Sequence, residues 1–356
     1  MTQNLLQVAI IGASSYTGAE LARLLAAHPR AELKIATASG ERAGVPLSNL
    51  FPHLRGLCDI ETSELDVEKL ARECDFTFIA LPHGKSLEVA PQLLEAGVKV
   101  CDLGADFRLR CTKQYSHWYK LEHTAPETLG EAVYGLPEWN REKIKGARLV
   151  ANPGCYPTSA ILPLAPFVEK KLIKPESIIV DAASGTSGAG RASFGLGMHF
   201  PELSNDFKAY NIASHRHTPE IEQGLKDACG GRESEDVRIS FTAHLLPIVR
   251  GILSTCYADW TQDLTTDDAL QVLRDKYEDE PFVRVLPRGE LPQIKFVAGS
   301  NFCDIGAVAD ERTRRLILVC AEDNLVKGAS GQAVQNMNLM SDFPETMGLE
   351  SAPLFP

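Results

Sequence analysis

The 356-residue chain has no apolar run of about 18 residues, so we expect no membrane-spanning helix. Basic residues are scarce: 36 Lys and Arg face 47 Asp and Glu, and the net charge of −11 argues against a nucleic-acid partner. The first four residues, MTQN, lack a basic stretch leading into an apolar segment, so we expect no secretory signal. Low-complexity tracts, long linkers and internal repeats are absent from the sequence.

The nine cysteines include no CxxC pair, and the sequence therefore predicts no metal site. Their odd number fits a reduced chain and predicts a cytoplasmic location. The length and the composition, 44% hydrophobic and 23% charged, are typical of a globular protein with two domains.

A glycine-rich loop stands near the start of the chain. Residues 5–11 are apolar and lead into GASSYTG at 12–18, after which leucines recur at helical spacing as far as His28-Pro29. A second strand is expected at 33–38, which completes a βαβ unit that holds a pyrophosphate at a helix N-terminus. Gly12 would make the tight turn, Gly18 would let the helix pack closely, and the Ser15 hydroxyl could touch phosphate. The predicted cofactor-binding residues of this loop are Gly12, Ser14, Ser15, Tyr16, Thr17 and Gly18.

Glycine turns also join strands to helices in proteins that bind no nucleotide, so the assignment of a nucleotide-binding domain also depends on the strands and helices that follow. Residues 76–80 and 98–102 are expected to be strands, with a helix at 86–96 between them. The residues after the second strand, ATASGER at 36–42, place no acid at the strand end, and Ser39 and Arg42 could meet a 2′-phosphate. The missing acid and these two side chains favour NADP over NAD, although the negative charge of Glu41 counts against NADP and Arg42 could simply be solvated.

Cys155 is the candidate nucleophile. A strand at 147–151 ends at Pro153-Gly154, and a long apolar segment follows the cysteine. Cys155 would then lie at a helix N-terminus, where free N–H groups and the helix dipole stabilise a thiolate or an oxyanion. A buried structural cysteine is the alternative.

The run HRHTPE at 215–220 contains the candidate general base, His217. Glu220 is three residues from His217, within reach of its ring, and would fix the tautomer and raise the basicity of that ring. Thr218 or Ser214 is expected to cap the helix that starts here. Alternatively, His215 could be a packing or substrate-contact residue, and Glu220 only a charge near the helix dipole.

Three further stretches are candidate ligand sites. SGTSGAGR at 184–191 follows a strand at 178–181 and could cradle a phosphate or the nicotinamide end of a cofactor, or it could be a mobile loop. We assign Ser184 and Gly185 to substrate and Ser187 and Gly188 to cofactor. Arg108 follows a predicted strand end and could grip a phosphate or carboxylate, or pair with Asp106.

A strand at 316–320 precedes AEDNLVKGA at 321–329 and a helix that runs to about residue 340. Asp323 or Asn324 is the expected N-cap of that helix. We expect the helix to return to the nucleotide domain, where Asn324 could reach the nicotinamide.

Together the motifs GASSYTGAEL, NPGCYPT, SGAGR, HRHTPE and DNLVKG closely resemble the N-acetyl-γ-glutamyl-phosphate reductase family. They span nearly the whole chain in the family's order. Ser15 and Ser159 depart from the residues the family commonly has, and neither touches the proposed chemistry.

The resemblance implies an α/β protein: a Rossmann-type parallel-sheet domain (1–154), an α+β catalytic and dimerisation domain (155–320), and a C-terminal helix (321–356) that returns to the first domain. It also implies a homodimer or homotetramer in the cytoplasm, acting in arginine biosynthesis on a small-molecule acyl phosphate. The implied mechanism uses NADPH to reduce a thioester on Cys155, with His217 as acid and base.

Three other interpretations remain open. A related reductase could act on aspartyl phosphate or on a carrier-linked aminoadipyl or glutamyl phosphate. A Cys–His hydrolase would leave the Gly12 loop unexplained. A non-catalytic NADP-binding redox sensor would leave the HRHTPE cluster unexplained.

Overall fold

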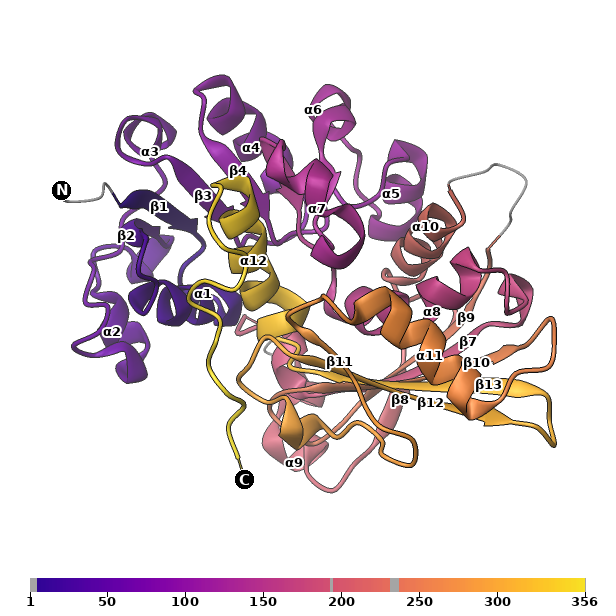
Figure 1. The fold of residues 1–356 in the computed structure, drawn as a ribbon. Coiled ribbons are helices and arrows are strands. Elements are labelled where there is room, and N and C mark those ends of the chain that lie inside the picture. Colours follow the sequence, from indigo (N-terminus) through magenta and orange to yellow (C-terminus); the bar gives the residue numbers. More distant parts are fainter. Residues whose placement is uncertain (1–4, 193–194, 231–236, 356) are drawn as a thin grey trace. The chain divides into compact units, whose positions relative to one another are not determined.

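The computed structural model describes residues 5–192, 195–230 and 237–355, which divide into two compact units (Figure 1). The first unit comprises Met1–Pro153, Gly190–Ala192 and Ala329–Ser351. The second comprises Gly154–Ala189, Ser193–Gly328 and Ala352–Pro356. The domain boundaries predicted at residues 154 and 320 stay a proposal.

The first unit is built on a six-stranded parallel sheet in the order β2-β1-β3-β4-β6-β5. Its strands are β1 (Leu6–Ile11), β2 (Ala31–Thr37), β3 (Phe76–Ile79), β4 (Lys99–Asp102), β5 (Val133–Tyr134) and β6 (Leu149–Ala151). Every residue of β3 and of β6 is buried, as in a parallel sheet covered on both faces. The strand order reverses direction beside β1, and ligands of open α/β sheets bind outside the carboxyl ends of the strands at such a point.

Helices connect these strands. They are α1 (Tyr16–Ala26), α2 (Leu47–Leu50), α3 (Val67–Glu73), α4 (Ser86–Glu95), α5 (Thr112–Tyr119), α6 (Pro126–Glu131), α7 (Pro137–Lys145) and the C-terminal α12 (Gly331–Met340). The β1–α1–β2 unit expected from the glycine loop is present, and α1 ends two residues before His28. Every residue of α12 is buried, and none of them is charged.

The second unit is built on a seven-stranded mixed sheet in the order β11-β12-β13-β10-β7-β9-β8. Its strands are β7 (Ile179–Ser184), β8 (Lys208–Tyr210), β9 (Ser240–Leu245), β10 (Ile252–Asp259), β11 (Val283–Val285), β12 (Cys303–Asp310) and β13 (Arg315–Glu322). Its helices are α8 (Cys155–Glu169), α9 (Phe200–Leu203), α10 (Thr218–Ala228) and α11 (Thr266–Tyr277). In β10, buried residues alternate with partly exposed ones, so one face of the sheet is covered and the other is left open.

Helix α8 lies in the hydrophobic core of the second unit. It packs against β10, β13, α10 and α11, and its residues 156–168 are all buried (Figure 1). Pro166 lies inside the helix and has no N–H, so it cannot bond the carbonyl of Leu162, four residues earlier. The Tyr277 hydroxyl donates to that carbonyl instead, at 2.6 Å, and removes the cost of burying it unpaired.

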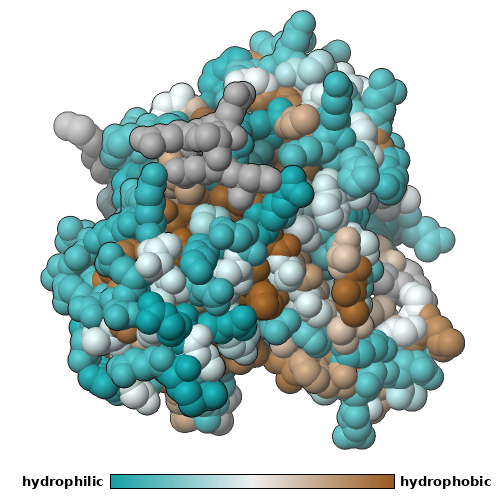
Figure 2. Space-filling model, turned by 90° about the vertical axis from the view of Figure 1, so that its right-hand side faces the viewer, coloured by the Kyte–Doolittle hydropathy of each residue, from teal (hydrophilic) through white to brown (hydrophobic). Residues whose placement is uncertain are grey.

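The predicted fold class, a Rossmann-type domain followed by an α+β domain, is confirmed. Within the described residues, no helix is long and apolar enough to cross a membrane. Nor do those residues contain a group of three or more His, Cys, Asp or Glu side chains placed to hold a metal ion. Figure 2 shows one face of the molecule, on which hydrophilic residues predominate and hydrophobic ones form small groups.

Candidate active site

The loop between β1 and α1 brings backbone very close to backbone. Gly12 has a φ of +86°, and a Cβ there would lie 2.4 Å from the carbonyl oxygen of Ala80. A Cβ on Gly18 would lie 2.6 Å from the carbonyl oxygen of Gly12. Only glycine fits at either position, in agreement with the tight turn and the close helix packing expected of them.

Ser15 is the N-cap of α1. Its hydroxyl accepts from the N–H of Gly18 and donates to the carbonyl of Gly12, each at 2.9 Å. Ser14 precedes this cap, and Tyr16 and Thr17 are the first two residues of the helix, which has no acidic residue in its first turn. The loop therefore fits a dinucleotide diphosphate at a positive helix end. Contact between the Ser15 hydroxyl and phosphate stays a prediction.

The end of β2 lies against the same loop. The Thr37 carbonyl accepts from the N–H of Ala13 at 2.8 Å. Beyond this strand, Ser39 is exposed and precedes a 3₁₀ turn, Gly40–Arg42, in which Arg42 is half-buried. Neither Thr37 nor the following Ala38 is an acid that would bind a ribose hydroxyl, so this region is compatible with a 2′-phosphate.

Cys155 is the first residue of α8, as the sequence predicted. It follows the N-cap Gly154 and is partly exposed, whereas the next thirteen residues, 156–168, are buried. The first turn contains no acidic residue, and Pro157 brings no N–H of its own. Cys155 therefore stands at the end of the helix where the dipole stabilises a thiolate.

Glu220 fastens the turn that carries this cysteine. Its side chain is 1% exposed, and its Oε1 accepts from the backbone N–H of Gly154 at 2.8 Å. The carboxylate therefore holds the residue immediately before Cys155, which is a role that the spacing to His217 did not indicate. Its predicted role in orienting His217 stays a prediction.

The predicted caps of α10 are wrong. His217 is its N-cap, with no hydrogen bond from the side chain to the helix, and Thr218 is already the first helical residue. The N–H of Thr218 donates to the carbonyl of His215 at 3.0 Å, so a backbone turn replaces the expected side-chain cap of Thr218 or Ser214.

The two histidines differ in environment. His215 is buried, and its Nδ1 accepts from the backbone N–H of His217 at 3.1 Å, which places the ring proton on Nε2. Burial, reinforced by the charge of Arg216, lowers the pKa of His215 to about 4. His215 is therefore neutral at pH 7, while His217 is half-buried.

Both imidazoles pack against Tyr156, the residue after Cys155. The Tyr156 ring centroid lies 5.4 Å from that of His215 and 5.9 Å from that of His217. The two imidazole centroids are 4.9 Å apart. We call Tyr156, Tyr210, His215, His217 and Phe241 the ring cluster.

Sequence reasoning missed the two tyrosines of the ring cluster. Their hydroxyl oxygens are 2.9 Å apart, and the Tyr156 hydroxyl also donates to the carbonyl of His244 at 3.2 Å. Burial raises the pKa of Tyr210 to about 12, and the nearby charge of Cys155 adds to the rise. Tyr210 is therefore an uncharged hydroxyl close to the thiol. Tyr156 could have been suspected from its place beside Cys155, but nothing in the sequence marked Tyr210.

The segment after β7 is a hydrogen-bonded turn. Thr186–Ala189 form a 3₁₀ turn, and the N–H of Gly185 donates to the carbonyl of Gly251 at 2.9 Å. A Cβ on Gly185 would lie 2.8 Å from the carbonyl oxygen of Val249. Buried Ser184 donates to the carbonyl of Gly185 at 3.1 Å, whereas Gly188 is exposed.

Asn324 joins this turn to the loop before β10. Its Oδ1 accepts from the N–H of Gly251 at 2.7 Å, and its Nδ2 donates to the hydroxyl of Ser187 at 3.0 Å. The side chain is 2% exposed, so the amide fixes two loops to each other. The assignment of Asn324, Ser187 and Gly188 to the cofactor stays a prediction.

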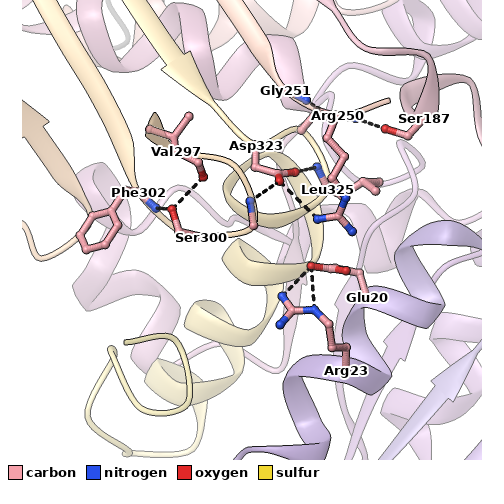
Figure 3. Close-up of polar contacts among 12 residues, drawn as sticks. Glu20, Arg23, Ser187, Arg250, Gly251, Val297, Ser300, Phe302, Asp323 and Leu325 are labelled. Atoms are coloured by element: carbon pink, nitrogen blue, oxygen red, sulfur yellow. Dashed lines mark hydrogen bonds and ion pairs between the residues drawn. The ribbon is translucent and has the colours of Figure 1, made fainter. Parts of the chain in front are cut away.

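The expected cap of the last helix is also wrong. A π-helical turn, Val326–Ser330, comes first, and Ser330 is the N-cap of α12. Asp323 instead accepts from Leu325, Gly299 and Arg250, at 2.9, 2.7 and 3.2 Å (Figure 3). Its buried carboxylate therefore ties three segments of the second unit together.

The π-helical turn meets Cys155 at Gly328. A Cβ on Gly328 would lie 2.8 Å from Cβ of Cys155, 3.2 Å from its Cα, and 2.8 Å from Oε1 of buried Glu322. Gly328 thus packs directly against the first residue of α8. π turns inserted in helices often mark functional sites, and here the turn lies against the candidate nucleophile Cys155.

Arg108 belongs to the first unit and is 7% exposed. Its Nε donates to the carbonyl of Asn152 and one Nη to the carbonyl of Leu103, each at 2.8 Å. The guanidinium thus joins the ends of β4 and β6. Its assignment to substrate stays a prediction.

The structure therefore gathers part of the predicted site in each unit. Cys155, Ser184, Gly185, His215, His217 and Glu220 belong to the second unit, as do Ser187, Gly188 and Asn324. The glycine loop, Ser39, Arg42 and Arg108 belong to the first.

Comparison with known proteins identifies the class. Residues 7–147 match the family model "Semialdehyde dehydrogenase, NAD binding domain", and residues 155–324 match "Semialdehyde dehydrogenase, dimerisation domain". Among solved structures, aspartate semialdehyde dehydrogenase II of Vibrio cholerae, complexed with ASA, aligns with a TM-score of 0.72 at 17% identity, over 95% of this chain and 99% of that one. Aspartate semialdehyde dehydrogenase of Candida albicans, with NADP, gives 0.71 at 18% identity over 95% and 99%. The fold is that of the semialdehyde dehydrogenases, with a domain for a nicotinamide dinucleotide.

Sequence relatives narrow the class. N-acetyl-gamma-glutamyl-phosphate reductase of Pelotomaculum thermopropionicum is 53% identical over 98% of this chain and 99% of the relative. That of Desulfotalea psychrophila is 52% identical over 99% and 100%. The chain therefore belongs to the N-acetyl-γ-glutamyl-phosphate reductase family of oxidoreductases, which confirms the resemblance found in its motifs.

Proposed function

We propose that this chain uses NADPH to reduce N-acetyl-γ-glutamyl phosphate to N-acetylglutamate semialdehyde and phosphate, through a thioester on Cys155. The observation that carries the proposal is the placement of Cys155 at the start of buried α8, next to the ring cluster. The relatives named above, at 53% and 52% identity, support the choice of substrate.

The first half of the reaction forms the thioester. The Cys155 thiolate attacks the acyl carbon of the substrate, an S–C bond forms, and the C–O bond to phosphate breaks. The helix end stabilises the thiolate before the attack and the oxyanion that develops on the carbonyl. Glu220 keeps the turn in place by holding the N–H of Gly154.

The second half releases the aldehyde. NADPH, when bound, would supply the hydride for the carbonyl carbon of the thioester, whose oxygen then becomes that of a thiohemiacetal on Cys155. We assign to His217 the proton that this oxygen gains on reduction and gives up again when the C=O bond of the aldehyde re-forms. His215 is less suited, because it commits its Nδ1 to a backbone N–H and its lowered pKa, about 4, keeps it neutral at pH 7. When the S–C bond breaks, the sulfur leaves as the thiolate and the semialdehyde is free.

Each residue group has an assigned ligand in this proposal. The NADP residues are Gly12, Ser14, Ser15, Tyr16, Thr17, Gly18, Ser39, Arg42, Ser187, Gly188 and Asn324. The substrate residues are Arg108, His215, Ser184 and Gly185. The absence of an acid at the end of β2 supports NADP over NAD.

We also propose a cytoplasmic homo-oligomer, a dimer or a tetramer, that pairs through the open face of the second sheet. On this face the partly exposed residues of β10 lie beside those of β13, with Thr255 opposite Val319 and Tyr257 opposite Ile317. The same face also carries Asp181 beside Thr255, and Asp259 opposite Arg315, so it mixes apolar and charged side chains. The match to a dimerisation domain supports its pairing with a second copy.

The experiment is phosphate-dependent reduction of NADP by N-acetylglutamate semialdehyde, with aspartate semialdehyde as control. Rapid turnover of the first substrate and little of the second is expected. Preference for aspartate semialdehyde would move the enzyme to another acyl phosphate, and no turnover of either would remove the proposed function.

A further inference from the structure

We propose that Arg191 binds a phosphate group of the bound dinucleotide. The inference rests on the proposed function, since it takes a nicotinamide dinucleotide to be the ligand. Arg191 was not among the residues assigned to the cofactor above.

Arg191 lies in a short segment, Gly190–Ala192, that groups with the first unit although the residues on either side belong to the second. Its Nη1 donates to the carbonyl of Ser14 at 3.2 Å, within the loop between β1 and α1. The guanidinium carbon also lies 4.4 Å from the ring centroid of Phe51. The segment thus places a cation one residue from the N-cap of α1.

The charge of Arg191 is not neutralised within the described part of the chain. Its hydrogen bonds go to the carbonyl of Ser14 and, at 3.5 Å, to that of Leu50, and both are uncharged. The nearby helix end is positive as well and carries no acidic residue in its first turn. Two positive features side by side, without an acid, make a site for an anion.

The geometry of Arg191 also suits phosphate. A guanidinium has five N–H donors in a rigid fork. In Arg191, Nη1 and Nη2 each donate one hydrogen bond to a backbone carbonyl. Stacking on Phe51 and the two carbonyl contacts hold the fork in one orientation before a ligand arrives. Little entropy is then lost when a phosphate binds to the remaining donors.

Two phosphates of NADPH could be the one that Arg191 binds: the diphosphate, and the 2′-phosphate on the adenosine ribose. NADH carries the diphosphate alone. Comparing the two dinucleotides therefore tells the sources apart.

The test measures the Kd of NADPH and NADH by fluorescence titration of wild type, Arg191→Met and Arg148→Met. Arg148 is the matched control, since it lies in the same unit, carries the same charge and pairs at the surface with Glu131. We expect Arg191→Met to raise the Kd of NADPH by about tenfold or more, and Arg148→Met to leave it within about twofold. Arg191→Lys, which keeps the charge and loses the fork, should fall between wild type and Arg191→Met.

An equal rise for NADH would identify the diphosphate, and an unchanged NADH affinity would identify the 2′-phosphate. An NADPH affinity of Arg191→Met equal to that of Arg148→Met would overturn the inference. If wild type bound NADPH normally in that case, the proposed function would stand, whereas failure of wild type to bind it would remove the function itself. Thermal unfolding of the unliganded variants shows whether Arg191→Met is folded. If Arg191→Lys lost as much NADPH affinity as Arg191→Met and both had a lowered Tm, the role of Arg191 would be structural, which would also overturn the inference.

Discussion

Gly328→Ala should impair the reactivity of Cys155 without replacing any residue assigned a role in the chemistry. The added methyl would lie 2.8 Å from Cβ of Cys155 and 3.2 Å from its Cα. Carbon atoms in good contact are about 3.5 Å or more apart, so the start of α8 or the π-helical turn must move by roughly 0.7 Å. The turn cannot yield freely, because the same methyl would also meet Oε1 of buried Glu322 at 2.8 Å.

The size of the effect follows from that displacement. Overpacking of this kind costs about 1–3 kcal/mol of stability. A misplacement of about 1 Å at the reacting centre can cost about 10²-fold in rate. We therefore expect kcat to fall by roughly 10- to 100-fold, with a lower Tm and a slower reaction of the Cys155 thiol with iodoacetamide.

Gly130→Ala is the matched control. Gly130 lies in α6, and a Cβ there meets nothing within 4 Å. This variant should keep wild-type turnover and be as stable or slightly more stable, because alanine is the better helix former. Near-normal kcat and thiol reactivity in Gly328→Ala would refute the argument that Gly328 supports the start of α8.

Three further predictions concern the two histidines and Glu220. In pH–rate profiles, His217→Asn should lose most of the turnover, while His215→Asn should keep the same pH dependence with weaker substrate binding; loss of turnover in His215→Asn alone would reverse the assigned roles. Because the folded pKa of His215, about 4, lies below its unfolded value near 6.5, the unfolded state binds more protons between these pH values, and stability should fall as pH drops from about 6.5 to 4. His215→Asn should remove part of that fall in the free energy of unfolding, and an unchanged pH dependence would contradict the buried neutral state. Glu220→Gln keeps an oxygen that can accept from Gly154, so it should retain more activity than Glu220→Ala; equal losses in kcat would show that the charge of Glu220, rather than its bond to Gly154, is what matters.

Local signals in the sequence were enough to predict much of the fold. The unit β1–α1–β2 and the start of α8 at Cys155 depend on glycine turns and on apolar periodicity within a few residues, and both were predicted. The cap of α10 was not, because His217 replaces a side-chain cap with a backbone turn. The π-helical turn escaped prediction for a similar reason, since its sequence resembles that of an ordinary helix.

The candidate site was predictable where its residues lie in one motif and not where distant segments meet. Tyr210 joins Tyr156 across 54 positions, Arg191 reaches Ser14 across 177, and neither pairing has a sequence pattern. Glu220 was selected for its spacing to His217, yet the contact that the structure provides is with Gly154, 66 positions away. Burial decides these contacts, and it is a property of the folded chain.

The covalent role of Cys155 is tested most directly by mixing the enzyme with N-acetyl-γ-glutamyl phosphate in the absence of NADPH, quenching in acid and mapping the peptides by mass spectrometry. We expect the N-acetylglutamyl mass on the peptide that contains Cys155, its loss on addition of NADPH before the quench, and no adduct in Cys155→Ser. An adduct on a different cysteine, or rapid turnover by Cys155→Ser, would contradict the thioester mechanism.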